Sequence, residues 1–205
     1  MLDSKARKLI DPPLNWAGRK LAGLGLTANQ VTLLGLALGL IAAVLIALGA
    51  TTWALLPLVL GRIADGLDGA IARATRKYDF GGYLDITADF LFYGAVPLGF
   101  VFADVPTHGA AGAFLLTSFY VNGASFLGYA LLADRYGMET TAQGNKSLYY
   151  SNGLLEGTET IAFFVVICLF PTVFVPLAWI FGGLCFLTAG LRVWGAKQIF
   201  VKERT

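Results

Sequence analysis

Charged side chains are scarce in this sequence of 205 residues. Asp, Glu, Lys and Arg together make up 14% of the chain, whereas a soluble globular domain carries about 25%. Apolar residues make up 57%, and the mean hydropathy is +0.68. The shortage of charge argues against an ordinary soluble domain and indicates a chain that is solvated mainly by lipid.

Cysteine and clustered positive charge are scarce as well. Cys168 and Cys185 both lie in apolar runs and outside any motif, which argues against a disulfide framework. The net charge is only +2 and no basic stripe is present, so we expect no nucleic-acid partner.

Long apolar runs, in contrast, are abundant. A helix needs about 20 apolar residues to cross a bilayer, and each such run must be helical because lipid offers no hydrogen bonds to the backbone. We therefore predict an all-α fold, an integral membrane bundle of six transmembrane helices that forms a single domain over residues 1–205. The spans are expected within 30–197, at 30–50, 53–75, 82–103, 110–134, 154–172 and 175–197, with breaks at 104–107 and at Pro171.

Residues 1–28 precede the first span and predict an N-terminal interfacial amphipathic helix. Asp11, followed by Pro12 and Pro13, has the composition of a helix start. Such a helix lies in the headgroup layer, although an ordinary amphipathic lead-in without catalytic meaning fits the pattern equally well. Its apolar stripe would consist of Leu14, Ala17, Leu21 and Leu24.

Next to this lead-in, Thr27 and Gln30 have the spacing of a capping box that opens the first span.

Basic residues fall on one side of the six-span arrangement. They precede the first span, separate the second from the third and the fourth from the fifth, and follow the sixth, whereas the three opposite connections carry no Lys or Arg. The positive-inside rule then places both termini on the cytoplasmic side, and we expect the chain in the cell inner (plasma) membrane. Arg62 remains and lies well inside the second span.

Four carboxylates interrupt the second and third apolar runs. An Asp at the centre of a membrane helix costs about 2.5–3.5 kcal/mol, so a group of them requires compensation. Residues three or four positions apart share a helical face. In the second run this spacing joins Asp65, Asp68, Gly69, Ala72 and Arg73, and in the third it joins Gly81, Asp85 and Asp89.

A short basic connection separates the two runs, so they are expected to be antiparallel neighbours whose carboxylates converge. Like charges at such proximity need cations, and the absence of His and Cys beside them favours Mg²⁺, Mn²⁺ or Ca²⁺ over zinc or copper. Four carboxylates suffice for two ions, the arrangement used for in-line displacement at phosphorus. Arg73 suits a phosphate, and Gly69 leaves room for a ligand. The pattern indicates phosphoryl transfer.

The same residues resemble the signature of the CDP-alcohol phosphatidyltransferase family. Every fixed position is present in the run Asp65-x2-Asp68-Gly69-x2-Ala72-Arg73-x7-Gly81-x3-Asp85-x3-Asp89. The resemblance implies transfer of a phosphatidyl-type group from a CDP-activated lipid, with CDP-diacylglycerol as the expected donor, to an alcohol. CMP is released, and the reaction serves phospholipid biosynthesis.

The resemblance also implies roles for single residues. Asp65 and Asp85 would bridge two divalent cations, Mg²⁺ or Mn²⁺, with Ca²⁺ as a non-productive occupant. Asp68 would complete one site and Asp89 the other, and Asp89 would also act as the catalytic base.

Five residues are expected to contact the CDP part of the donor: Asn29, Thr32, Gly69, Ala72 and Arg73. The family often has Pro where this chain has Ala28, and a small hydroxyl residue where it has Asp79. The second departure leaves one donor contact unassigned.

The acceptor is the least defined part of the prediction. Inositol, inositol phosphate and glycerol phosphate are the candidates. Arg135, Lys146 and Arg192 would bind a phosphorylated acceptor, or they merely obey the positive-inside rule and the acceptor carries no phosphate. Members that use phosphorylated acceptors have two arginines where this chain has Gly157 and Thr160.

A small ion- or proton-coupled transporter is the alternative function, because intramembrane Asp residues often mark ion paths. The clustering of the carboxylates at one end of two spans argues against it. By analogy with the family we also expect a homodimer, for which Gly35 and Gly39 offer a close-packing motif.

Overall fold

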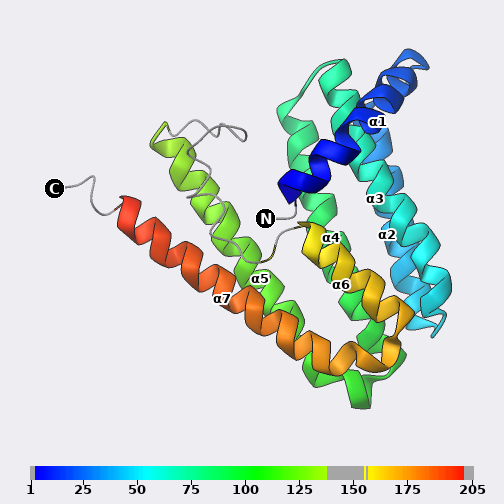
Figure 1. Ribbon diagram of the computed structural model, residues 1–205, viewed down its shortest axis with the longest axis vertical. Helices are drawn as coiled ribbons and strands as arrows, with labels where there is room; N and C mark the ends of the chain where they lie inside the picture. Colours follow the sequence, from blue (N-terminus) through cyan, green and yellow to red (C-terminus); the bar gives the residue numbers. More distant parts are fainter. Residues whose placement is uncertain (1–2, 138–154, 156, 201–205) are drawn as a thin grey trace.

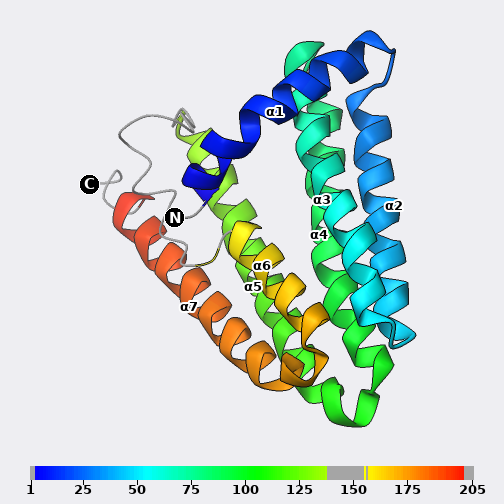
Figure 2. The same ribbon diagram turned by 45° about the vertical axis from the view of Figure 1, so that its right-hand side comes forward.

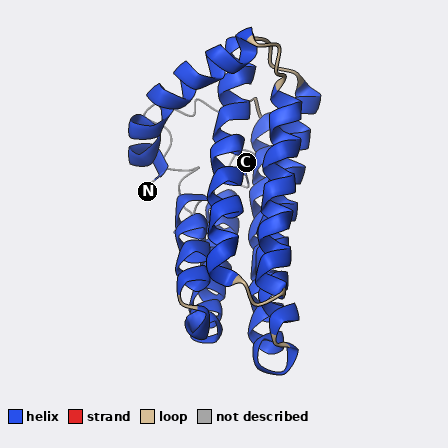
Figure 3. Cartoon of the chain, turned by 90° about the vertical axis from the view of Figure 1, so that its right-hand side faces the viewer, coloured by secondary structure: helices blue, strands red, loops and turns tan. Residues whose placement is uncertain are grey.

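All regular structure that the computed structural model describes is helical. It describes residues 3–137, 155 and 157–200, and no strand occurs in this part of the chain (Figures 1 and 3). The elements are α1 (Asp3–Gly23), α2 (Ala28–Ala47), α3 (Thr51–Ala74), α4 (Asp79–Ala103), α5 (Val105–Arg135), α6 (Gly157–Leu169), the 3-10 turn η1 (Pro171–Val173) and α7 (Phe174–Phe200).

The ends of the helices follow local signals. The capping box at the start of α2 is confirmed, because Thr27 and Gln30 exchange side-chain hydrogen bonds with each other's backbone N–H. Pro171 separates α6 from α7, also as predicted. The break expected at 104–107 is too long: α5 already begins at Val105, because the Asp104 carboxylate accepts the N–H of Thr107 at 3.2 Å and caps the helix.

Four segments are long and apolar enough to cross a membrane within the described residues: α2, α4, α5 and Pro171–Phe200. α3 has 24 residues but carries the charged face. α6 has 13 residues, about 20 Å at 1.5 Å per residue, and is shorter than the span expected at 154–172. Its end at Leu169 follows from Pro171, which cannot continue the helix.

The N-terminal helix α1 begins earlier than expected. The predicted start at Asp11 is wrong, because Pro12 and Pro13 lie inside a helix that already begins at Asp3. The proline rings hold φ near the helical value, but each proline also removes a backbone N–H donor from the helix. The predicted apolar stripe is one residue too long, because Leu24 lies beyond the end of α1 and is 79% exposed.

Helix α2 packs against both α3 and α4, α5 pairs with α7, and α1 crosses the end of the bundle where α2 begins and α3 ends (Figures 1 and 2). The crossing of α2 and α3 is close, because Gly35 and Gly61 face each other's backbone. Gly39 faces the ring of Phe92 on α4. Both glycines of the Gly35-x3-Gly39 motif are therefore used for packing within the chain.

The main core lies between helices α2 to α7, on the side away from α1. It contains fully buried aromatic residues, among them Phe92, Phe100, Phe164 and Phe174. Large apolar side chains are also widely exposed, for example Trp53 (76%), Leu48 (76%) and Trp194 (62%). Exposed apolar surface on this scale marks a membrane protein rather than a soluble monomer.

Candidate active site

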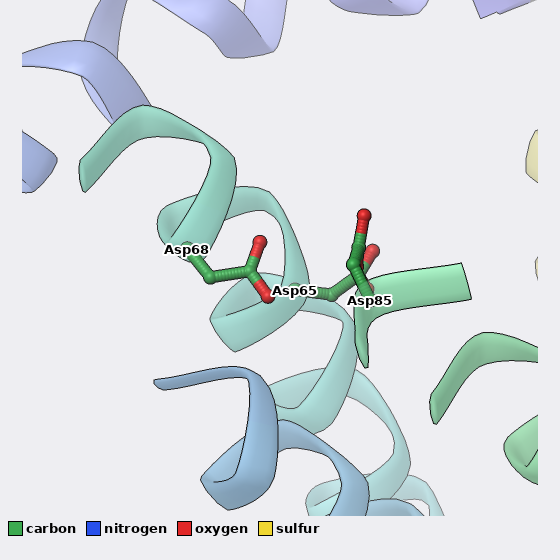
Figure 4. Close-up of side chains that lie close together, drawn as sticks. All are labelled: Asp65, Asp68 and Asp85. Carbon is green, nitrogen blue, oxygen red and sulfur yellow. The ribbon is translucent and has the colours of Figure 1, made fainter. Parts of the chain in front are cut away.

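Three of the four predicted metal ligands meet at the end of the bundle that α1 covers. Oxygen atoms of Asp65 and Asp68 on α3 and of Asp85 on α4 all lie within 4.8 Å of one another. Figure 4 shows the three side chains turned toward a common space. The expectation that carboxylates of the two runs converge is thereby met for these three residues.

The helical spacing explains the convergence. Asp65 and Asp68 are three residues apart and share one face of α3. Only residues 75–78 connect α3 to α4, so α4 turns back directly and carries Asp85 to the same level.

Asp68 is the most buried of the carboxylates, with 5% of its surface exposed. Its Oδ2 accepts a hydrogen bond of 2.5 Å from Oγ1 of Thr32 on α2, and Thr32 is also 5% exposed. This bond ties a third helix to the cluster. Thr32, predicted to contact the donor, thus orients a metal-ligand candidate.

Asp89 is placed differently from the other three. Its Oδ1 accepts a hydrogen bond of 2.6 Å from Nη1 of Arg62, and the same Nη1 lies 3.6 Å from Oδ1 of Asp65. The Arg62 guanidinium also lies 3.9 Å from the centre of the Phe92 ring. The Arg62 guanidinium therefore links Asp89 to the cluster of Asp65, Asp68 and Asp85.

Arg62 lies well inside a predicted span, and the sequence alone predicts no role for it. The signal was available, because Arg62 precedes Asp65 by three residues and so lies on the carboxylate face of the helix.

The predicted donor-binding residues lie around the cluster. A Cβ on Gly81 would come 3.2 Å from Oδ1 of Asn29, so Asn29 reaches the start of α4. Gly69 and Ala72 are half-buried on α3, one turn beyond Asp65 and Asp68.

Arg73 extends toward α1. Its Nε and Nη2 donate to Oδ1 of Asn15 at 3.2 and 3.0 Å. A hollow of about 280 Å³ between the two helices is lined by Asn15, Arg19, Ala70, Arg73 and Ala74. The sequence does not predict this contact of Asn15, because Asn15 belongs to no recognisable motif.

The predicted acceptor residues are scattered over the other half of the chain. Arg135 is the exposed last residue of α5. Arg192 on α7 donates from Nη1 to the backbone oxygen and Oδ1 of Asn122 at 3.0 Å each and to Oγ of Ser125 at 2.6 Å. Lys146 lies outside the described residues.

The three converging carboxylates fit a divalent cation. Mg²⁺ and Ca²⁺ bind oxygen at about 2.0–2.6 Å, so the ligands of one ion lie no more than about 4–5 Å apart. Asp65, Asp68 and Asp85 satisfy that limit as they stand, and their all-oxygen chemistry suits Mg²⁺ or Mn²⁺.

Comparison with known proteins agrees with these residues. The profile of a family described as CDP-alcohol phosphatidyltransferase matches residues 25–194. The chain is 46% identical to inner membrane protein YnjF of Escherichia coli K12. The alignment of 194 residues covers 95% of this chain and 94% of that protein. The chain is also 41% identical over 97 residues to archaetidylinositol phosphate synthase of Pyrococcus horikoshii, a match that covers 47% of this chain and 52% of that protein.

The fold is also found among solved structures. The crystal structure of Mycobacterium tuberculosis phosphatidylinositol phosphate synthase PgsA1 with CDP-DAG bound superposes with a TM-score of 0.58 at 24% identity and covers 90% of each chain. The apo form of the same protein gives a TM-score of 0.55. At this identity the likeness establishes a shared fold.

Proposed function

Because the chain belongs to the CDP-alcohol phosphatidyltransferase family, we propose that it transfers a phosphatidyl-type group from a CDP-activated lipid to an alcohol and releases CMP. CDP-diacylglycerol is the proposed donor, and phospholipid biosynthesis is the proposed role. The family match gives no support to the transporter alternative. The observation that carries the proposal is the convergence of Asp65, Asp68 and Asp85 from two helices.

These carboxylates, with Asp89, would hold two divalent cations, Mg²⁺ or Mn²⁺. Bound cations of this kind neutralise the pyrophosphate and the charge that develops at phosphorus. Thr32 keeps the Asp68 carboxylate in place through its hydrogen bond.

Asp89 is proposed as the base. It takes the proton of the acceptor hydroxyl, whose oxygen then forms a bond to the phosphorus that carries the lipid. The bond between that phosphorus and the bridging oxygen of the pyrophosphate breaks, and CMP leaves with the bonding electrons. In this structure the Asp89 carboxylate accepts a hydrogen bond from Arg62 at the edge of the cluster.

The donor would lie between α1, α3 and the starts of α2 and α4. Arg73, which is exposed beside the hollow at Asn15, offers a cation to the CDP phosphates. Gly69 has no side chain and Ala72 has a small one, so both leave room for the nucleotide beside α3. On the opposite side of the donor, Asn29 lies against Gly81 at the start of α4.

Inositol phosphate, inositol and glycerol phosphate remain the proposed acceptors. Arg135, Lys146 and Arg192 are the cations proposed for a phosphorylated acceptor. Hydrogen bonds to Asn122 and Ser125 on α5 hold the Arg192 guanidinium at the contact between α7 and α5.

The proposed setting is the cell inner membrane, with six spans, α1 in the headgroup layer and the active site facing the cytoplasm. The name of the Escherichia coli relative supports this location. A homodimer is proposed by analogy with the family. Cross-linking in native membranes should capture it, and capture of monomer alone would count against it.

The test of the reaction is direct. Purified protein is incubated with CDP-diacylglycerol, Mg²⁺ and each of the three acceptors, and CMP is measured. We expect CMP with one acceptor and its loss on addition of a chelator. CMP formation with none of a broad panel of alcohols would contradict the proposed function.

A further inference from the structure

Arg62 carries the one guanidinium that contacts the carboxylate cluster within the described residues. It donates to Asp89 at 2.6 Å and lies 3.6 Å from Asp65. Its side chain is 13% exposed. The position is therefore not a solvated surface pair, whose two ends would separate easily.

One further contact holds the guanidinium in place. The Phe92 ring lies 3.9 Å beneath it, and Phe92 is fully buried in the core. Nε of Arg62 is buried and has no hydrogen-bond partner in the described part of the chain. A buried cation with an unsatisfied donor depends on its carboxylate partners for compensation.

The contacts of Arg62 divide the four carboxylates unequally. Asp65, Asp68 and Asp85 converge on one point, whereas Asp89 faces the guanidinium. A divalent cation bound between Asp65 and Asp89 would lie close to this positive charge. Repulsion between the two cations weakens binding there, most strongly where water is excluded.

From this geometry we infer that Arg62 competes with a divalent cation for Asp89 and so sets the affinity of the second metal site. The first ion binds to Asp65, Asp68 and Asp85. The second ion binds only when Asp89 leaves Arg62. The inference rests on the proposed function, because it concerns the same cluster.

The experiment is a titration of the purified protein with Mn²⁺, with free Mn²⁺ followed by electron paramagnetic resonance. Wild-type protein should show one tighter and one weaker class of site. Arg62→Gln removes the competing charge and should tighten the weaker class by about tenfold, which corresponds to about 1.4 kcal/mol. Arg62→Met is a second neutral variant for this apolar position, and gel filtration with thermal unfolding identifies any variant that fails to fold.

Two controls separate competition from a general effect of charge. Arg62→Lys keeps the cation and should keep the wild-type affinity of the weaker class. Arg76→Gln removes a positive charge from the connection after α3, where the guanidinium lies over the Tyr78 ring rather than against a carboxylate, and should leave both classes unchanged.

The outcomes are distinguishable. Unchanged or weaker binding in the folded neutral variants would overturn the inference, as would tightening by Arg62→Lys or by Arg76→Gln to the same extent. No Mn²⁺ binding by wild-type protein would instead contradict the metal site on which the proposed function depends.

Discussion

Helices α2 and α3 cross so closely that Gly61 has no room for a side chain. A Cβ at this position would lie 2.9 Å from the carbonyl oxygen of Gly35 and 3.4 Å from the backbone nitrogen of Gly39. Because both neighbours are backbone atoms, Gly61→Ala requires the two helices to move apart. The crossing lies near the Thr32–Asp68 hydrogen bond that joins the same helices.

The size of the effect follows from the distances. Ordinary van der Waals contact begins at 3.4 Å, so the helices must separate by roughly 0.5 Å, and overpacking of this kind costs about 1–3 kcal/mol. Alanine gains up to about 1 kcal/mol over glycine in a helix, which offsets part of the loss. Gly190→Ala in α7 is the matched control, because nothing lies within 4 Å of its added Cβ.

Thermal unfolding of the detergent-purified variants, followed by tryptophan fluorescence, measures the difference. Gly61→Ala should be less stable than Gly190→Ala by about 1–3 kcal/mol. A midpoint for Gly61→Ala equal to or above that of the control would refute the close crossing of α2 and α3.

Three further predictions concern single polar contacts. Asp89→Asn should abolish CMP release while the protein still folds and binds CDP, and wild-type turnover would contradict its role as base. Thr32→Val should lower the free energy of unfolding by about 1.5–3 kcal/mol through loss of the bond to Asp68; Thr32→Ser should not, and equal losses would refute the bond. Hydrogen bonds from Thr107 hold the pKa of Asp104 below its ordinary value of 3.8, so this cap stabilises α5 above that pH and is lost as pH falls through the lowered pKa. Asp104→Ala should therefore lower the thermal midpoint at neutral pH but not in acid, and an equal effect at both would contradict the cap.

Much of the fold was predictable because lipid restricts the choices for each apolar run. The ranges of five predicted spans coincide with helices α2, α3, α4, α5 and α7, and all of these except α3 are long and apolar enough to cross a membrane. The errors lie at helix ends. A polar residue such as Asp104 serves equally well as a loop residue or as a helix cap, and Pro12 and Pro13 are compatible with a helix start and with a helix interior. Tertiary packing, which a single segment does not contain, decides between them.

The placement of the site residues could be predicted to a similar extent. Helical spacing placed Asp65 and Asp68 on one face, and the short connection placed Asp85 opposite them. The pairing of Asp89 with Arg62 was not predicted, because the direction of a long side chain depends on the neighbouring helix and here on the Phe92 ring. Asn15 was missed for the same reason, since α1 had to be positioned on α3 first.

The central claim is that Asp65, Asp68 and Asp85 bind a divalent cation together. Crystals grown with Mn²⁺ and measured at a wavelength where manganese scatters anomalously test it most directly. We expect an anomalous peak between these three carboxylates, bonded to an oxygen of each. Manganese bound elsewhere, with the three side chains turned apart, would contradict the claim.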